Sequence, residues 1–234
     1  NYSVVVSNDF GSVETGIFSV QVSDAIMNGL VGWWKFDETN GTVAYDSSGN
    51  GNDGNLTNGP TWTTGKIRGA LSFDGMNDYV LIPATSDLDL VHLNISAWIY
   101  TSDYNQDGFI FEKTSNGTVN SQYNLFLEDN HFLYWRTLPN SGGNSHDSSL
   151  TTNTLTSWNF ISASYDGVTK KIFLNGNLST SDSYSGTIVQ NPNGISLIGK
   201  HPNAYFFNGI IDDVRIYDRA LSAAEVQALY NLGQ

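Results

Sequence analysis

The C-terminal stretch Phe207–Gln234, FNGIIDDVRIYDRALSAAEVQALYNLGQ, carries the clearest structural signal in this chain. Its first half alternates in hydrophobicity and predicts a β-strand over Ile210–Tyr217, because successive strand side chains point to opposite faces. One face is expected to hold Ile210, Asp212, Val214 and Ile216. A buried carboxylate needs a cation, hydrogen-bond donors or a bound proton, since burying a bare charge is costly. Asp212 is therefore the first candidate functional residue.

The second half predicts one short helix. Ser222 to Glu225 reads Ser-Ala-Ala-Glu, which is a capping box: the serine caps the helix, and the glutamate reaches back to the serine amide. A short apolar stripe follows at Val226, Leu229 and Tyr230. The helix is expected to pack this stripe on a sheet.

Much of the remaining chain has the two-residue period of strands. The segments expected as strands are Trp33–Phe36, Ala70–Phe73, Tyr79–Ile82, Leu93–Tyr100, Trp158–Tyr165, Lys171–Leu174 and Ile195–Ile198. Asp166-Gly167 and Asn175-Gly176 favour tight hairpin turns, because these residues accept positive φ angles. Residues 46–54 predict an irregular loop. The pattern predicts an all-β, antiparallel sandwich.

Four motifs in order resemble one known family. They are WWKFDE at 33–38, DSSGNGNDG at 46–54, ALSFDGMNDYVLIP at 70–83 and IDDVRIYDRALSAAE at 211–225. This series resembles the bacterial laminin-G-like jelly-roll domains of the concanavalin A-like lectin/glucanase superfamily, over roughly residues 29–232. The resemblance implies a jelly-roll topology. It implies no single function, because this fold serves many.

The first 24 residues are expected to be separate from the jelly roll. They predict two strands around an Asn-Asp-Phe-Gly turn and resemble the last hairpin of an immunoglobulin-like domain. Residues 25–28 are expected to be a linker, and residues 29–234 the jelly roll. Because no signal peptide or initiator Met is present, we expect a mature product or a fragment of a multidomain protein.

Composition restricts the partners and the source. The net charge of −13 argues against duplex nucleic acid and anionic membranes, which favour positive proteins. It suits neutral glycans or divalent cations, as well as ordinary acidic solubility. The absence of cysteine excludes disulfides and thiolate metal sites, and it favours a microbial source. No apolar run is long enough to span a bilayer.

The resemblance implies a structural calcium ion that joins the first and last strands. Hard oxygen ligands from Asp- and Asn-rich loops suit Ca²⁺. The expected ligands are Asp37, Asp46, Asn52, Asp212 and Asp213, with Asp53 nearby. The alternative is that Asp46 and Asp212 cap turns and accept backbone amides, as aspartates often do.

An aromatic and polar strand at 131–136, HFLYWR, predicts a glycan-binding surface. Leu133 and Trp135 point one way and Phe132 and Tyr134 the other, so one pair must pack in the core. The candidate binding residues are Tyr104, Asn124, His131, Tyr134, Trp135, Arg136 and Tyr205. The alternative for each aromatic residue is ordinary core. Trp33, Trp34, Trp98 and Trp158 fit the family's core pattern.

The sequence does not favour an enzyme. Hydrolases of this superfamily often carry a Glu-x-Asp-x-x-Glu strand, which is absent here, and the four histidines lack metal-ligand spacing. A catalytic domain elsewhere in the parent protein is compatible with this reading.

The sequence thus predicts a secreted or surface-located, non-catalytic carbohydrate-binding module. The alternative is a module for cell adhesion or spacing, which contacts another protein. Its N-terminal hairpin could then add to the edge of a partner's sheet.

Overall fold

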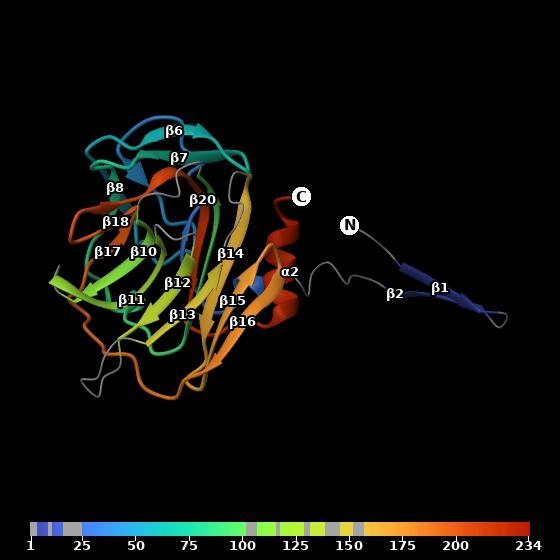
Figure 1. Cartoon of the computed structure of the whole chain (residues 1–234). Coiled ribbons are helices and arrows are strands. Elements are labelled where there is room, and N and C mark those ends of the chain that lie inside the picture. The colour runs from blue at the N-terminus through green and yellow to red at the C-terminus, as the bar shows by residue number, and fades with distance from the viewer. Residues whose placement is uncertain are drawn as a thin grey trace.

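The chain folds into a β-sandwich of two antiparallel sheets (Figure 1). The computed structural model describes residues 4–8, 11–15, 25–101, 107–115, 118–128, 132–138, 146–151 and 157–234. Within these residues it confirms the predicted all-β antiparallel fold with a short C-terminal helix.

The first sheet, called here the front sheet, has eight strands in the order β13-β12-β11-β10-β17-β8-β5-β4. The strands are β4 (Val43–Ala44), β5 (Gly54–Thr57), β8 (Tyr79–Ile82), β10 (Gly108–Ser115), β11 (Thr118–Glu128), β12 (Phe132–Thr137), β13 (His146–Thr151) and β17 (Ser196–Ile198).

The second sheet, called here the back sheet, has the order β16-β15-β14-β9-β20-β7-β6, and β3 also pairs with β20. The strands are β3 (Leu30–Trp34), β6 (Thr61–Thr64), β7 (Gly69–Asp74), β9 (Leu93–Tyr100), β14 (Asn159–Tyr165), β15 (Thr169–Leu174), β16 (Asn177–Ser183) and β20 (Asn208–Tyr217). The predicted Asn-Gly turn lies between β15 and β16, and Asn175 and Gly176 have φ angles of 51° and 80°.

Several short elements complete the described chain. A 3-10 helix, η1, spans Ser86–Leu88, and the hairpin β18 (Lys200–His201) with β19 (Tyr205–Phe206) lies beside β10. The strands β1 (Val4–Asn8) and β2 (Gly11–Thr15) pair antiparallel, as predicted. Figure 1 draws this hairpin apart from the sandwich. Its origin in an immunoglobulin-like domain stays a prediction.

The main hydrophobic core lies between the sheets. On β9, Leu93, Ile95, Ala97 and Ile99 all belong to it, which confirms the predicted alternation. Trp34 is fully buried in the same core. Burying these apolar side chains is the main stabilising contribution to the fold.

A second apolar cluster lies on the outer side of the back sheet, beneath helix α2 (Ala223–Asn231). Val226 and Leu229 of the helix pack there with Trp98 and Phe160. The Ser222 capping box is present in full, as predicted. The chain therefore covers the aromatic residues of this outer face with its own helix (Figure 1).

Of the four tryptophans predicted as core, one lies in the main core and the other three lie in or against the outer cluster. Trp34 and Trp98 are buried, one in each cluster, and Trp158 packs partly buried against the outer cluster. Trp33 is half-buried there, and its Nε1 donates a hydrogen bond to Asp213 Oδ1 at 2.6 Å.

The prediction that Ile210, Asp212, Val214 and Ile216 share one face of β20 is wrong, because only Val214 and Ile216 of these four belong to the main core. The register against β9 shifts between Asp212 and Arg215, and Asp213 has a φ of 50°. Such a bulge inserts one residue and reverses the alternation. As a result, Ile211 and Val214 both face the main core, while Asp212 lies opposite Trp98.

Candidate functional site

Five ring side chains form a row on the outer face of the front sheet, and we call it the aromatic row. Its members are Tyr134 on β12, Phe126 on β11, Phe109 on β10, and His201 and Tyr205 on the β18–β19 hairpin. Cross-strand pairing brings the first three together, because Phe126 lies opposite both Tyr134 and Phe109. Neighbouring centroids are 5.2 Å apart for Tyr134–Phe126 and 4.6 Å for Phe126–Phe109.

The rings stack face to face. The Phe109 and Phe126 planes differ by 5°, and coplanar rings with centroids only 4.6 Å apart would overlap. The two rings therefore stand on the sheet with their faces parallel. Parallel aromatic rings attract each other when they are offset. Phe109 also contacts His201 and Tyr205, at centroid distances of 4.5 and 6.3 Å.

Solvent reaches the row at its two ends. Phe109 and Phe126 are 4% and 2% exposed, whereas Tyr205 is 44% exposed and Tyr134 is half-buried. The buried rings in the middle fix the positions of the outer tyrosines. A rigid, partly exposed aromatic ring can stack on another flat apolar surface without losing much conformational entropy.

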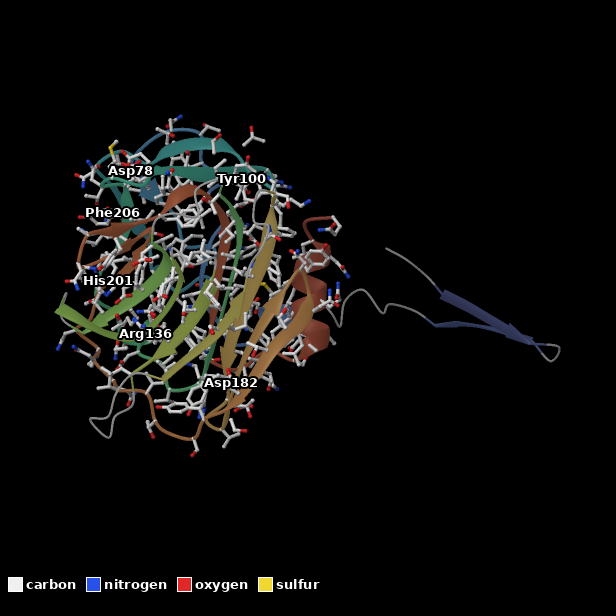
Figure 2. The ribbon with its side chains drawn as sticks, viewed as in Figure 1. Asp78, Tyr100, Arg136, Asp182, His201 and Phe206 are labelled. Atoms are coloured by element: carbon white, nitrogen blue, oxygen red, sulfur yellow. The ribbon has the colours of Figure 1, made fainter. Side chains whose placement is uncertain are left out.

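Arg136 adds a fixed positive charge to this surface. Its guanidinium lies 4.8 Å from the Phe126 ring centroid, a cation–π distance. Burial, together with the Arg136 charge, lowers the pKa of His201 to about 4, so this imidazole is neutral at neutral pH. The His201 Nδ1 accepts a hydrogen bond from the Asn203 amide at 3.1 Å, which leaves Nε2 to carry the proton. Arg136 and His201 are labelled in Figure 2.

Two buried polar side chains lie next to the row on the same face. Asn124 is paired with Arg136 across β11 and β12, and its Nδ2 donates to Glu112 Oε2 at 3.0 Å. Burial raises the pKa of Glu112 to about 8, so its carboxyl is largely protonated at neutral pH. Glu112 Oε1 and Asn124 Oδ1 have no hydrogen-bond partner among the described residues.

The structure brings together four of the seven predicted binding residues: Asn124, Tyr134, Arg136 and Tyr205. Asn124 is fully buried, so of these four only Tyr134, Arg136 and Tyr205 reach solvent. Tyr104 and His131 lie outside the described residues.

The prediction that Trp135 stacks on a ligand is wrong. Its side chain is fully buried in the main core, and the buried Lys170 lies 5.3 Å from its ring. The outward pair on β12 is instead Phe132 and Tyr134, both half-buried.

Sequence reasoning missed Phe109, Phe126, Glu112 and His201. The register of β10 against β11 shifts between Phe109 and Phe111, which turns Ile110 and Phe111 both toward the core. Simple alternation would have given Phe109 and Phe111 the same face.

The five predicted calcium ligands lie in two separate places. Asp46 and Asn52 belong to the loop before β5, where Asp46 Oδ1 accepts the amides of Trp33 and Ser48 at 2.9 and 2.8 Å. Asp46 Oδ2 accepts the Asn52 amide at 3.0 Å. These contacts are those of the turn-capping alternative.

The other three predicted ligands lie near the bulge of β20. Asp37 Oδ1 accepts the Gly69 amide at 3.0 Å, and Asp213 Oδ1 pairs with Arg215 at 3.1 Å. Asp212 Oδ2 accepts the Ile67 amide at 2.7 Å, while its Oδ1 has no partner among the described residues. Burial raises the pKa of Asp212 to about 8.

In the part of the chain that is described, no three His, Cys, Asp or Glu side chains are grouped to hold a metal ion. Backbone amides or the Arg215 guanidinium already contact most of the carboxylate oxygens that would have to bind a cation. The calcium ion stays a prediction.

Comparison with known proteins places the chain in a family. A laminin G family model, described as the concanavalin A-like lectin/glucanases superfamily, matches residues 73–227. The chain belongs to this superfamily. The resemblance found in the sequence is thereby confirmed. A comparison with curated proteins found no match.

Solved structures of this superfamily fold are binding domains in several cases. The binding domain of Paraclostridial mosquitocidal protein 1 is 20% identical with a TM-score of 0.69, over 88% of this chain and 52% of that one. The botulinum neurotoxin serotype D binding domain is 14% identical with a TM-score of 0.69, over 89% and 52%. The chain thus spans about half the length of these toxin domains.

Domain 4 of AbnA, a GH43 extracellular arabinanase from Geobacillus stearothermophilus, was solved in complex with arabinotriose. It is 20% identical with a TM-score of 0.64, and the match covers 88% of this chain and 98% of that domain. At these identities the solved structures show that the fold is shared. In the described part of the chain, no helix is both long and apolar enough to cross a membrane.

Proposed function

We propose that this chain is a non-catalytic carbohydrate-binding module of a larger extracellular protein. The observation that carries the proposal is the aromatic row, whose buried centre holds Tyr134 and Tyr205 at the accessible ends beside Arg136. Sugars bind to proteins through C–H faces stacked on aromatic rings and through hydroxyls bonded to polar side chains. The arabinotriose complex of AbnA domain 4 supports the proposal, because it gives a carbohydrate ligand to the same fold.

The polar groups around the row fit a neutral glycan. Arg136 and the neutral His201 both carry N–H donors, and such donors suit the hydroxyl groups of a neutral sugar. The overall charge of −13 disfavours a polyanionic glycan by long-range repulsion. A neutral polysaccharide or glycan is therefore the proposed ligand class.

The non-catalytic part of the proposal is supported by the absence of a Glu-x-Asp-x-x-Glu strand from the sequence and by the toxin structures of the same fold, which are binding domains. Hydrolysis of a glycosidic bond generally uses two carboxyl groups on either side of the bond. Of the acidic residues that the strand register places beside the row, Glu112 is fully buried, Glu128 lies opposite Phe132 and Asp147 lies opposite Arg136.

A screen of immobilised glycans and neutral polysaccharides tests the proposal, run in parallel with calcium and with EDTA. We expect binding to at least one neutral glycan in the micromolar to millimolar range that is common for weak recognition. If no glycan of the panel bound in either condition, the result would contradict the proposal and would favour contact with a protein.

The same two conditions test the proposed structural calcium ion. If calcium binds the folded chain, it stabilises the fold by mass action, so EDTA should lower the melting temperature. Asp212→Ala should then cost on the order of 2–4 kcal/mol in calcium. An unchanged melting temperature that is insensitive to EDTA would remove the ion from the account.

A further inference from the structure

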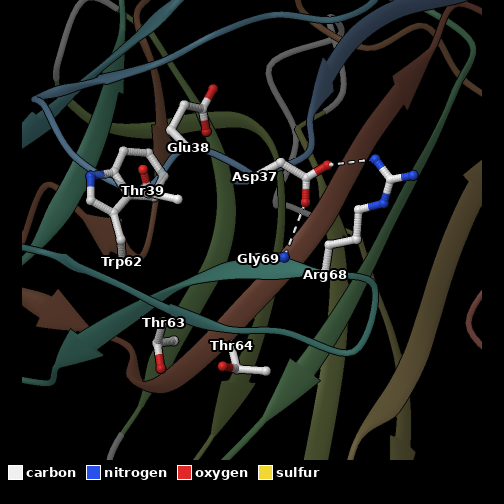
Figure 3. Close-up of a pocket in the computed structure, with 8 residues that line it drawn as sticks. All are labelled: Asp37, Glu38, Thr39, Trp62, Thr63, Thr64, Arg68 and Gly69. Atoms are coloured by element: carbon white, nitrogen blue, oxygen red, sulfur yellow. Dashed lines mark hydrogen bonds and ion pairs between the residues drawn. The ribbon is translucent and has the colours of Figure 1, made fainter.

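A hollow of about 580 Å³ lies away from the aromatic row, at the end of the sandwich where β6 forms the edge of the back sheet. It shares no residue with the row. Figure 3 shows its lining, which combines one indole, three threonines, two carboxylates and one guanidinium. The residues are Asp37, Glu38, Thr39, Trp62, Thr63, Thr64, Arg68 and Gly69.

The Trp62 ring is held in place at this edge. Its Nε1 donates to the Gly41 carbonyl at 3.0 Å, and the residue packs half-buried against the main core, opposite Leu71 of β7. The hydrogen bond and the packing fix the ring while part of its surface stays accessible. A fixed indole can stack on a ligand at a small entropic cost.

Glu38 presents an acceptor that the described chain does not use. Its Oε1 accepts the Tyr45 amide at 2.9 Å, which orients the carboxylate. Its Oε2 is buried and has no hydrogen-bond partner among the described residues. A buried acceptor without a donor is costly, so a small movement of the neighbouring side chains that lets a ligand hydroxyl donate to it would be favoured.

Arg68 provides donors on the other side of the hollow. Its side chain is 84% exposed, and its ion pair with Asp37 is long, at 3.9 Å from Nη1 to Oδ2 (Figure 3). Its φ of 64° is unusual for a residue with a side chain, and such backbone costs energy unless the surroundings fix it. Because the side chain is exposed and its ion pair is long, most guanidinium donors remain available to a ligand.

We propose that this hollow is a second carbohydrate site, which takes one neutral sugar residue. The sugar's C–H face stacks on Trp62, one hydroxyl donates to Glu38 Oε2, and another accepts from Arg68. Two carboxylates against one guanidinium make the lining net negative, which favours a neutral sugar over a uronic acid. With the aromatic row, the module would then engage glycans at two places, and linked sites raise avidity on long chains.

Proton–nitrogen NMR of the tryptophan indoles tests this site without reference to the row. The probes are neutral methyl glycosides (β-glucopyranoside, β-xylopyranoside and α-arabinofuranoside) and, as the charged comparison, methyl β-glucuronide. Trp62→Phe identifies the Trp62 signal. We expect at least one neutral glycoside to shift that signal saturably below about 100 mM, and the glucuronide to leave it unchanged.

Matched variants locate the effect. Glu38→Gln keeps the oxygen that the Tyr45 amide needs but replaces Oε2, so it should weaken the titration about tenfold. Asp87→Asn removes an exposed carboxylate elsewhere and should change nothing. Tyr134→Ala should also leave the Trp62 titration unchanged, which separates this site from the row.

Three outcomes would overturn the proposal. They are no shift of the Trp62 signal with any neutral glycoside, an equal shift with the glucuronide, or full affinity in Glu38→Gln. A loss of polysaccharide binding in Tyr134→Ala alone would concern only the aromatic row.

Discussion

Aromatic rings gather on the outer faces of both sheets, but the chain treats the two groups differently. On the back sheet, helix α2 covers them: Trp98 stacks with Tyr230 at 5.6 Å and contacts Phe160 at 5.4 Å, and Trp98 is 1% exposed. On the front sheet, the aromatic row keeps Tyr134 and Tyr205 accessible. Rings that the chain covers itself contribute to folding, whereas accessible rigid rings are available to a ligand.

The largest expected effect is the loss of stability that follows when the aromatic cluster beneath α2 on the back sheet is disrupted. Trp98→Ala should destabilise the protein by about 3–5 kcal/mol, because it leaves a cavity beneath α2 and removes two ring contacts. Chemical denaturation would measure this loss, and affinity for a glycan should stay unchanged in the folded variant. A loss below about 1 kcal/mol would mean that α2 covers this face only loosely.

The second expected effect is a pH-dependent change in stability caused by the buried Glu112 carboxyl beside the aromatic row. Because burial raises the pKa of Glu112 from 4.5 to about 8, its contribution to stability is complete below pH 4.5. That contribution is lost as the pH rises through about 8, where the folded protein must hold a buried carboxylate. Glu112→Gln, which cannot ionise, should therefore gain about 2–4 kcal/mol on the wild type between these limits.

Denaturation at pH 4.5, 6.5 and 8.5 would measure the difference between the two proteins. Asp212, whose pKa is also raised to about 8, contributes equally to both and cancels. Parallel stability curves for wild type and Glu112→Gln would show that Glu112 is not held neutral in the fold.

A smaller effect concerns how α2 is held over the back sheet. Ser222 Oγ accepts the Glu225 amide at 3.3 Å, and Glu225 Oε2 accepts the Ser222 amide at 2.7 Å. Ser222→Ala should cost about 1 kcal/mol, as for other N-caps. Ser183→Ala on the exposed end of β16 is the matched control and should cost less than about 0.5 kcal/mol. Equal effects would remove the capping box from the account.

The comparison also shows what the sequence could predict. The capping box and the Asn175-Gly176 turn are local signals, and the structure has both. Alternation on β12 separated Trp135 from Tyr134 but could not say which faced the core, because that depends on the opposite sheet. The bulges at Asp213 and near Ile110 were hidden, since an inserted residue leaves no mark in an apolar pattern.

The proposed site could be predicted only in part, because its members come from several strands. Tyr134, Arg136 and Tyr205 could be named from one aromatic strand and one aromatic loop. Phe109 and Phe126 could not, because only cross-strand register places them between these residues.

The most direct test of the central claim is titration of a glycan selected by the screen into Tyr134→Ala and Tyr45→Ala by calorimetry. Tyr45 is 58% exposed and lies on the loop after β4, outside the aromatic row, so it is the matched control. The account predicts about tenfold weaker binding, or about 1.4 kcal/mol, in Tyr134→Ala, with unchanged affinity in Tyr45→Ala and both variants folded at the temperature of the titration. Equal affinity in wild type and Tyr134→Ala would contradict the account and move glycan binding away from the aromatic row.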